Sequence, residues 1–519
     1  MVATIETVSF QGIDVCPVEV QVHIGNGLPS FTIVGLANKA VSEARERVRA
    51  SLFAIGLALP PKRITINLAP ADTMKEGSHF DLAIALGLLV AMNVLPQEEL
   101  QNYVALGELS LDGRIAKVGG VLPAAIHASS LDLGLICPKA QGAEAAWAGG
   151  IDILAPQSLL EIVNHFKGTQ ILSPPSIPQI DETAYGKPTI DLADIKGQET
   201  AKRALEIAAA GGHSMLMSGP PGSGKSLLAA RLATILPKLS PAEALELSQI
   251  HSLGGTLPEG GLISTRPFRS PHHSASVAAI VGGGTRAKPG EVSLAHRGVL
   301  FLDELPEFNR SALEALRQPI ETGTVSIARA NAHVTYPARF QLIAAMNPCR
   351  CGHIDDDAQA CTRAPLCAAE YQNRISGPLL DRFDLFVDVA AVSVDDLAMP
   401  SNGESSTTVL TRVEAAREFG AMRMDGYANG VITNAEIDGR LLEEITNMDS
   451  GARALLLEAA KTLGLSARAY HRVQRVARTI ADLERKPNVS RTHIGEALSY
   501  RRVNSNRAAI GGGAVKGAA

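Results

Sequence analysis

The sequence predicts a multidomain α/β fold with a largely parallel sheet in its middle part, and two observations support this. Short apolar runs such as 214–217 and 298–302 alternate with longer amphipathic stretches, which is the pattern of buried strands covered by helices. The chain is 519 residues long, which is too long for a single hydrophobic core. We therefore expect several domains arranged around one α/β core.

The overall composition is that of an ordinary globular protein. Hydrophobic residues make up 46% of the chain and the formal net charge is -5. Global charge therefore gives no support for nucleic-acid binding, and any basic patch has to be local. The sequence contains no uninterrupted apolar run of about 18 residues and begins without the basic and apolar segments of a signal peptide. We expect a cytoplasmic protein that has no membrane partner.

Residues 1–165 predict a mixed α+β domain. Its strand-like and amphipathic runs lie at 30–34, 40–57, 63–67 and 81–90. The segment 166–189 is rich in proline and turn-forming residues, which is typical of a linker.

The α/β core is expected at residues 190–390, and a helical domain at 407–505 follows a second linker at 391–406. Five segments predict the helices of this last domain: 409–427, 434–445, 450–463, 467–484 and 491–503. The glycine-rich end, 506–519, is predicted to be a flexible tail.

A glycine-rich loop between a strand-like run and a helix-like run carries the strongest chemical signal in the chain. It consists of Gly219, Pro220, Pro221, Gly222, Ser223, Gly224, Lys225 and Ser226. The glycines let backbone N–H groups turn toward phosphate oxygens, Lys225 supplies positive charge to the β and γ phosphates, and the hydroxyl of Ser226 can bind Mg²⁺. The loop predicts binding of ATP together with Mg²⁺.

Two acidic residues follow the strand-like run 298–302 and complete a hydrolytic site. Asp303 is predicted to bind the metal ion, and Glu304 to activate the attacking water. The next strand-like run ends in Asn347, whose amide can hold this water against the γ phosphate. A loop that was merely a tight turn would not explain the acidic pair, so we expect ATP hydrolysis.

Residues 191–503 resemble the magnesium-chelatase-like branch of the AAA+ ATPases. The resemblance rests on the order of the phosphate loop, the acidic pair and Asn347, followed by two further motifs. These are Leu-Leu-Asp-Arg-Phe-Asp at 379–384 and Ser-Ala-Arg at 466–468. The resemblance implies that Asn347 is sensor 1, that Arg382 acts in trans on the ATP of a neighbouring subunit, and that Arg468 is sensor 2. It therefore also implies a homo-hexamer whose isolated subunits are nearly inactive.

The alternative for Arg382 is an ordinary surface ion pair with Asp381 or Asp384.

Two segments of the core are candidates for DNA contact. An insertion at 254–284 contains Arg266 and Arg269, and residues 321–339 predict a β-hairpin with Arg329 at its tip. The resemblance implies that such segments face the pore of the ring, where these arginines would grip a phosphate backbone. Solvated loop charge is the alternative for each of them.

The last domain is also locally basic. Arg468, Arg472, Arg475 and Arg478 recur at three- and four-residue steps and form one helical face. Contact with nucleic acid is one explanation of this face, and packing against ATP or a neighbouring subunit is the other.

Four of the six cysteines lie shortly after Asn347. They are Cys349, Cys351, Cys361 and Cys367. Four thiolates can bind a tetrahedral structural Zn²⁺ and so fix a loop that is too polar to fold by burial. Inert thiols are the alternative. Because this cysteine segment directly follows Asn347, loss of a metal ion is expected to disturb the hydrolytic site.

The first domain resembles the Lon protease fold in the runs 75–85 and 106–120. The resemblance places the catalytic serine of that family on His79 and its lysine on Ala124. The serine–lysine pair required for acylation is therefore missing at these positions. We expect an inactive Lon-like domain that serves ring assembly or binds DNA or a partner.

Over essentially its full length, the chain resembles the family of competence protein ComM and its YifB-type relatives. The resemblance implies a hexameric ATP-driven helicase for branched or single-stranded DNA, which promotes branch migration during natural transformation beside recombination proteins. The alternative is a motor that remodels a partner protein, as magnesium chelatase motor subunits do. The Lon-like domain, which chelatase motors lack, favours DNA.

Overall fold

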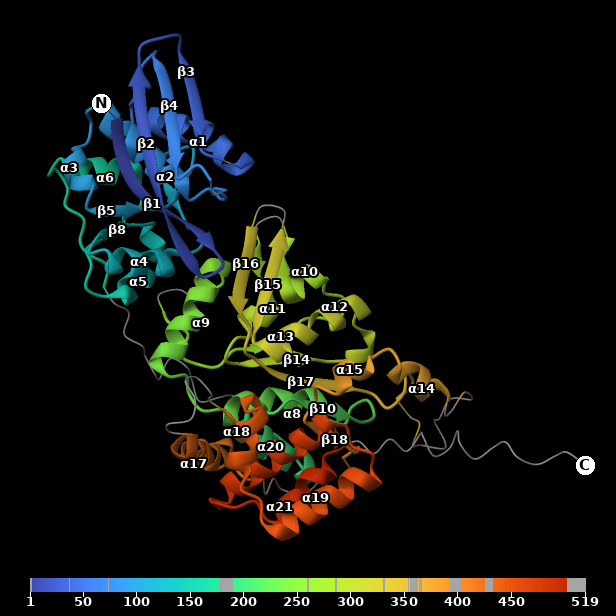
Figure 1. The fold of residues 1–519 in the computed structure, drawn as a ribbon. Coiled ribbons are helices and arrows are strands. Elements are labelled where there is room, and N and C mark those ends of the chain that lie inside the picture. Colours follow the sequence, from blue (N-terminus) through green and yellow to red (C-terminus); the bar gives the residue numbers. More distant parts are fainter. Residues whose placement is uncertain are drawn as a thin grey trace, which may run out of the picture.

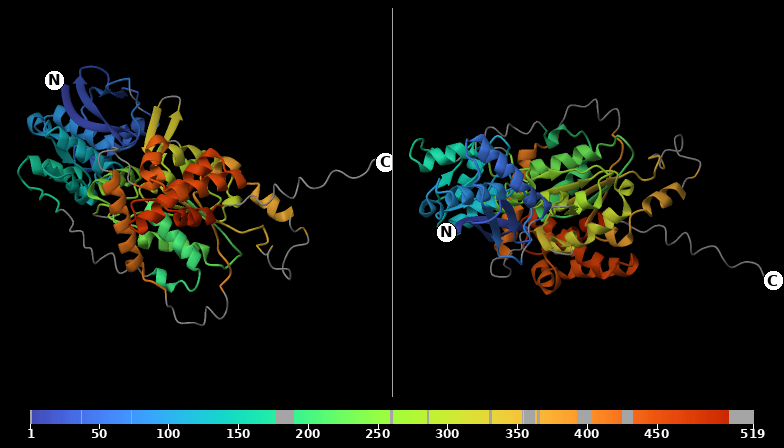
Figure 2. Two further views of the ribbon diagram at one scale, coloured as in Figure 1. Left: turned by 60° about the horizontal axis from the view of Figure 1, so that its bottom comes forward. Right: turned by 90° about the horizontal axis from the view of Figure 1, so that it is seen from above.

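The computed structural model describes residues 2–36, 38–72, 74–176, 190–258, 261–284, 287–329, 332–352, 354, 363, 366–392, 403–424 and 433–501. Within these residues, the strands form two main sheets, and the last helices pack beneath the second sheet (Figure 1). The N-terminal region lies at one end of the molecule in each view (Figure 2). None of the helices described is long and apolar enough to span a membrane. The predicted tail at 506–519 lies outside the described residues.

The N-terminal region contains a seven-stranded mixed sheet with the order β3-β4-β2-β1-β5-β8-β9. Its strands are β1 (Val2–Gln11), β2 (Asp14–Gly25), β3 (Ser30–Val34), β4 (Arg63–Ala69), β5 (Tyr103–Ala105), β8 (Gly134–Ile136) and β9 (Ile153–Leu154). A small hairpin, β6 (Glu108–Leu109) with β7 (Ile115–Ala116), stands beside it. The helices of this region are α1 (Lys39–Ala54), α2 (Phe80–Ala91), α3 (Gln97–Leu100), α4 (Val121–Ser130), α5 (Gly142–Ala145) and α6 (Leu159–Phe166).

Helix α2 is the centre of this region, because every residue from Phe80 to Val90 is buried. A helix that is apolar all round belongs inside a core, and α2 packs on β1, β2 and α1. Its one charged residue, Asp81, is fully buried and forms an ion pair of 2.6 Å with Arg47.

The middle of the chain forms a five-stranded sheet with the order β11-β14-β17-β10-β18. The strands are β10 (Met215–Ser218), β11 (Phe268–Arg269), β14 (Val299–Leu302), β17 (Gln341–Met346) and β18 (Leu385–Asp388). All four neighbouring pairs are parallel, which confirms the predicted parallel sheet. Alternate residues of β10 point to opposite cores, Met215 and Met217 to one and Leu216 to the other, so the sheet is buried on both faces.

The first of these cores contains α7 (Glu199–Gly211) and α8 (Lys225–Leu232), and the second contains α10 (Val277–Val281), α12 (Arg310–Ala315) and α13 (Arg317–Thr322). The remaining elements are α9 (Pro241–Gly254), β12 (Gly282–Gly283), β13 (Lys288–Pro289), α11 (Glu291–Leu294), β15 (Thr324–Arg329), β16 (Ala332–Pro337), α14 (Leu366–Gln372) and α15 (Gly377–Leu380). Strands β15 and β16 pair in antiparallel fashion, which confirms the predicted hairpin.

The segment 254–284 is only partly an insertion, which corrects the expectation from the sequence. Its residues Phe268 and Arg269 form β11 and pair with Val299 and Leu300 of the central sheet. Two residues cannot display a strand periodicity, so this strand could not be recognised before its partner was known.

The last region is helical and shares its core with the central sheet. Its helices are α17 (Ser406–Met424), α18 (Gly439–Thr446), α19 (Ser450–Thr462), α20 (Ala467–Leu483) and α21 (Arg491–Ser499), each within one of the five predicted segments or overlapping it. Val473, Val476 and Ile480 of α20 belong to the same hydrophobic cluster as Met215 and Met217 of β10. The helices are therefore packed on the sheet as part of one core.

Candidate nucleotide site

The phosphate loop joins β10 to α8 in a conformation that leaves its backbone accessible. Gly222 and Gly224 have φ values of +77° and +89°, and no atom lies within 4 Å of the position of an added Cβ at either residue. These positive φ values favour glycine, and the empty space lets a phosphate approach the backbone. The loop therefore fits the phosphate groups of a nucleotide.

Lys225 is folded back onto this loop. Its Nζ donates to the carbonyl oxygens of Gly219 at 2.7 Å and Pro220 at 2.8 Å, and lies 3.3 Å from Oδ1 of Asn347. Burial lowers the pKa of Lys225, while the charge of Asp303 opposes this shift. The ammonium group thus lies where it can exchange carbonyl oxygens for phosphate oxygens.

The predicted metal ligands and water-positioning groups meet at the carboxyl edge of the central sheet. Ser218 pairs with Met346, the residue before Asn347, and Leu302 of the next strand precedes Asp303. The hydroxyl of Ser226 donates to Oδ2 of Asp303 at 2.7 Å. A hydroxyl and a carboxylate in contact are a suitable oxygen donor pair for Mg²⁺.

Glu304 has a partner that the sequence analysis did not identify. It has a φ of +50°, and its carboxylate lies 3.5 Å from Nδ1 of His273. The ring of His273 in turn lies tilted against the ring of His272, with a centroid distance of 4.1 Å. His273 and Glu304 are 31 positions apart in the numbering, so their contact emerges only from the fold.

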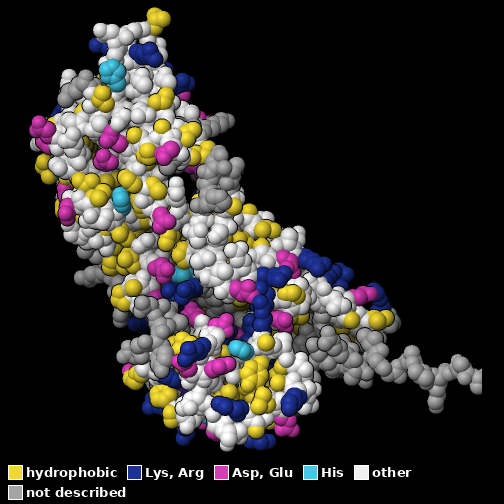
Figure 3. Space-filling view, viewed as in Figure 1, with side chains coloured by type: hydrophobic (Ala, Val, Ile, Leu, Met, Phe, Trp, Pro, Cys, Tyr) yellow, Lys and Arg dark blue, Asp and Glu magenta, His cyan; other side chains and the backbone are white. Residues whose placement is uncertain are grey.

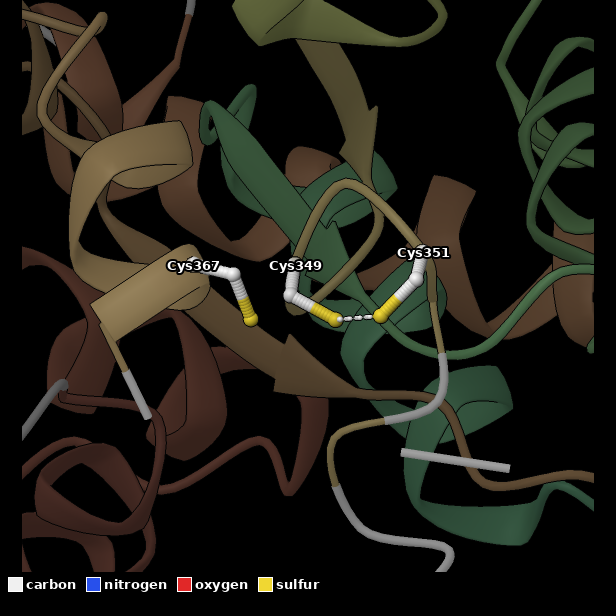
Figure 4. Close-up of side chains that lie close together, drawn as sticks. All are labelled: Cys349, Cys351 and Cys367. Carbon is white, nitrogen blue, oxygen red and sulfur yellow. Dashed lines mark hydrogen bonds between the residues drawn. The ribbon is translucent and has the colours of Figure 1, made fainter. Parts of the chain in front are cut away.

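Three of the four clustered cysteines come together beside the phosphate loop (Figure 4). The Sγ atoms of Cys349, Cys351 and Cys367 all lie within 4.8 Å of one another, and Cys349 Sγ is 3.1 Å from Cys351 Sγ. Tetrahedral Zn²⁺ with bonds of about 2.3 Å separates its sulfur ligands by about 3.8 Å, so these thiols would hold zinc once Cys349 and Cys351 move apart by about 0.7 Å. Cys361 lies outside the described residues.

This cysteine segment also touches the phosphate loop directly. A Cβ added to Gly352 would lie 2.4 Å from Cδ of Pro221. The contact gives a physical route by which the cysteine segment can hold the phosphate loop in position.

Arg382 and Arg468 lie at the opposite, amino edge of the central sheet. Arg382 comes just before β18, whose Leu385 pairs with Met215, the first residue of β10. The guanidinium of Arg382 is only 4% exposed and forms a 2.5 Å ion pair with Glu321, which Arg468 also approaches at 3.5 Å. Neither arginine is on the side of its own phosphate loop.

The two arginines line a cavity of about 790 Å³ between the central sheet and the helices. Eight arginines and five acidic residues are among its described lining residues, and dark-blue and magenta side chains lie together where the core meets the helices below it (Figure 3). The excess of positive charge makes this cavity suited to a phosphate group.

Asp384 connects the helices to this cavity. It accepts hydrogen bonds from Ser214 N at 3.1 Å and Arg472 Nη1 at 2.8 Å, and Ser214 Oγ donates to the carbonyl of Arg382 at 2.7 Å. Burial alone would raise the pKa of Asp384, but His213 and Arg472 hold this pKa well below its usual range. Among the described residues, Arg382 therefore pairs with Glu321 and not with Asp381 or Asp384, the partners considered from the sequence.

The proposed DNA-contacting arginines of the 254–284 segment are engaged within the core. Arg266 is 10% exposed and donates to the carbonyls of Pro237 and Arg297, each at 2.7 Å. Arg269 makes two 2.7 Å bonds to Glu291. The side chain of Arg329 lies outside the described residues, although its backbone ends β15.

Most of the predicted basic face of α20 points inward. Arg478 is fully buried and pairs with Asp482, Arg475 pairs with Asp438 and Arg472 with Asp384. Only Arg468 of this face is largely exposed, at 61%. Three of its four arginines are thus held by carboxylates of the same chain, which favours the packing explanation over contact with nucleic acid.

The Lon-like positions of the N-terminal region hold no catalytic pair among the described residues. His79 is 7% exposed and its Nε2 donates to the carbonyl of Val8 at 2.9 Å, while Ala124 is fully buried on α4. Burial lowers the pKa of His79 to about 4, so this imidazole is neutral near pH 7. The neighbouring Ser78 donates to Glu108.

Comparison with known families and proteins shows similarity over most of the chain. The family described as magnesium chelatase, subunit ChlI matches residues 191–397, and related descriptions of the same subunit match 20–141 and 403–501. Competence protein ComM of Haemophilus influenzae is 44% identical over 94% of this chain and 95% of its own. YifB of Escherichia coli is 44% identical over 95% and 96%, and the magnesium-chelatase 38 kDa subunit of Rhodobacter capsulatus is 25% identical over 63% and 92%.

Proposed function

The chain belongs to the ComM/YifB-type family of magnesium-chelatase-like AAA+ proteins, and on this premise we propose that it is a ring-forming ATPase that moves DNA. The proposed activity is that of a cytoplasmic, homo-hexameric helicase, which promotes branch migration while incoming DNA is integrated during natural transformation, together with recombination proteins.

The location of Arg382 and Arg468 carries this proposal. The phosphate loop and these arginines are at opposite ends of strands such as β10, whose four residues span about 13 Å at ~3.3 Å per residue. Neither arginine therefore faces the nucleotide of its own subunit. Both line the open, cationic cavity, where the γ phosphate of a neighbouring subunit can be reached if the subunits form a ring.

Each residue of the nucleotide site has a proposed role. Bound ATP with Mg²⁺ would supply the phosphoryl group that is transferred to water. Lys225 would leave its loop carbonyls to hold the β and γ phosphates, and Ser226 and Asp303 would hold the metal ion. Glu304 would take the proton of the water that Asn347 orients, and the arginines of the neighbour would stabilise the charge that develops on the γ phosphate.

The hairpin β15–β16 is the proposed DNA-gripping element. It stands out from the central sheet toward the N-terminal region (Figure 1), and its strand β15 directly follows α13, which carries Glu321. If the nucleotide of a neighbouring subunit alters the ion pair between Glu321 and Arg382, a movement of α13 can displace β15, because only a few residues separate Glu321 from the hairpin. Arg329 at its end remains the proposed contact to the phosphate backbone.

The in-trans role is tested by mixing two inactive variants. Lys225→Ala removes the nucleotide site, and Arg382→Ala removes the arginine that serves a neighbour. If the proposal holds, each variant alone is inactive, and an equimolar mixture recovers part of the ATP hydrolysis because Lys225→Ala subunits lend Arg382 to intact nucleotide sites. A mixture as inactive as its components argues against the in-trans role.

The DNA substrate is tested by steady-state ATP hydrolysis with and without a mobile four-strand junction. We expect strong stimulation that falls steeply with salt, and that is lost in Arg329→Ala while basal hydrolysis persists. The match to a magnesium-chelatase subunit supports one alternative, a motor that remodels a partner protein. Hydrolysis that no DNA alters would favour this alternative.

A further inference from the structure

A second cavity, of about 780 Å³, lies where the N-terminal region meets the ATPase core. Its walls are the end of β1, the loops around His79 and Glu108, the end of α9, and the base of the hairpin β15–β16. This volume is within the range of about 300–1,000 Å³ that is usual for ligand sites. No residue of the nucleotide site described above lines this cavity.

Strand β1 presents an open edge to this cavity. In its two-residue hairpin with β2, Gln11 pairs with Asp14 and Val8 with Pro17. The closing pair of such a hairpin exchanges two hydrogen bonds, and non-hydrogen-bonded and hydrogen-bonded pairs then alternate along the strands. Val8 and Phe10 belong to non-hydrogen-bonded pairs, so their N–H and C=O groups point away from β2. The position of Pro17, which has no N–H group, agrees with this alternation.

Among the described strands, only β5 is hydrogen-bonded to that edge, and β16 approaches the end of β1 without pairing with it. Strand β5 pairs with β1 only at Glu6, and His79 then occupies the carbonyl of Val8. Phe10 is the next residue whose main-chain groups point to this edge; it lines the cavity and, among the described strands, pairs only with β2. A strand edge with main-chain donors and acceptors is a template for an added extended segment.

Hydrogen bonds and apolar contacts join the N-terminal region to the ATPase core on two sides of the cavity. Glu144 accepts from Ser252 Oγ at 2.5 Å and Leu122 N at 3.1 Å, and Gly120 N donates to the carbonyl of Ser252 at 3.1 Å. At the other end, Ile13 packs against a cluster of the hairpin base that contains Val334 and Tyr336. The cavity is therefore built by fixed contacts from both regions.

The lining combines apolar walls with an excess of carboxylates. Phe10, Leu253 and Val334 supply apolar surface, and the charged lining residues are three glutamates and two lysines. Because Glu144 is already bonded to Ser252 and Leu122, Glu76 and Glu108 are the carboxylates available to a ligand. Glu76 and Glu108 attract a cationic side chain, whereas Lys117 and Lys288 leave the whole lining with an excess of only one carboxylate.

We propose that this cavity binds an extended segment of a partner protein, which pairs with the open edge of β1 at Phe10 and directs a Lys or Arg side chain toward Glu76 and Glu108. The site binds the segment without cleaving it, since Ser78 donates to Glu108 and the lysine position implied by the Lon resemblance holds Ala124. Because the hairpin base forms one wall, an occupant of the cavity contacts the proposed DNA-gripping element.

The test uses the full chain without nucleotide or DNA, so its outcome does not depend on the motor activity. The probe is a fluorescent peptide, acetyl-Val-Arg-Val-Thr-Val-amide, and binding is followed by fluorescence anisotropy. One control peptide carries N-methyl groups on alternate amides, which removes strand pairing while keeping the side chains. A second control peptide replaces the arginine by glutamate.

We expect the N-methylated and the glutamate peptides each to bind at least about tenfold more weakly than the probe. Glu108→Gln, which can still accept from Ser78, should weaken the arginine peptide alone. Ala140→Trp, at an exposed position of the lining, should block binding, whereas Ala54→Trp, at an exposed position of α1 outside the cavity, should not.

Hydrogen exchange supplies the decisive readout, because the amide of Phe10 should become protected when the probe binds. Equal affinity for the N-methylated peptide, or protection only outside β1, overturns the proposal. Competition by a single-stranded oligothymidylate would also overturn it and identify the cavity as part of a nucleic-acid site. Binding of none of the peptides overturns it as well.

Discussion

Replacing Gly352 by alanine is predicted to displace the phosphate loop. Gly352 has a φ of +86°, and an added Cβ would lie 2.4 Å from Cδ and 2.5 Å from Cγ of Pro221. Carbon atoms in contact prefer a separation of about 3.5 Å, so one of the two segments has to move by about 1 Å. Misplacement of a catalytic group by about 1 Å can cost about 100-fold in rate.

A matched variant separates this displacement from backbone strain. Gly255 has a φ of +71° and a ψ of +25°, and no atom lies within 4 Å of an added Cβ, so Gly255→Ala carries the strain alone. That strain is about 1–2 kcal/mol for a left-handed residue, and both variants should lose a similar free energy of unfolding. The assay is steady-state ATP hydrolysis, in which we expect kcat to fall about 10- to 100-fold for Gly352→Ala and to be retained in Gly255→Ala.

Equal kcat values in the two variants would refute the reasoning. In that case the cysteine segment moves instead of the phosphate loop, and the contact between Gly352 and Pro221 does not hold the loop in position.

Three further predictions concern the hydrolytic site and its supports. His273→Ala should raise basal ATP hydrolysis by up to about fivefold, the equivalent of ~1 kcal/mol, because it releases Glu304 from the imidazole, whereas His272→Ala should leave the rate unchanged; equal effects of the two variants would count against the contact between His273 and Glu304. Asp384→Asn should lower the free energy of unfolding in urea by about 3–5 kcal/mol because it removes one partner of a buried ion pair. The folded pKa of Asp384 is held below the unfolded value of about 3.9. The stabilisation by Asp384 is therefore fully present above pH ~3.9 and is lost as the pH falls toward the folded pKa. If the free energy of unfolding fell equally with pH in the wild type and the variant, this explanation would be contradicted. Cys367→Ser should reduce zinc content, measured by atomic absorption, and weaken ATP binding in parallel. Full ATP binding by the zinc-free variant would show that the zinc site does not support the phosphate loop.

The central sheet and its chemical groups follow from short-range patterns in the sequence. The strands β10, β14 and β17 are recognisable because each is a compact apolar run, and parallel strands place their carboxyl ends at one edge. That rule brings Lys225, Asp303 and Asn347 together without knowledge of any distant contact. The cysteine cluster was likewise visible, because three of its described members are close in the chain.

The orientation of the arginines was decided by the tertiary structure. Arg382 and Arg468 meet at Glu321, which precedes them by 61 and 147 positions in the numbering, and no local pattern links such positions. Burial of Arg266 and Arg478 likewise depends on carbonyl and carboxylate partners that the fold supplies. A guanidinium in a basic helical face looks the same in sequence whether it faces solvent or a buried aspartate.

The sequence by itself determined which residues can hold a nucleotide, because that chemistry requires particular side chains next to a strand end. Only the tertiary structure decided that the arginines face away from the phosphate loop of their own chain, and that the edge of β1 opens into a cavity shared with the ATPase core. Both features depend on how separate elements pack against each other, and packing is set by contacts between residues far apart in the chain.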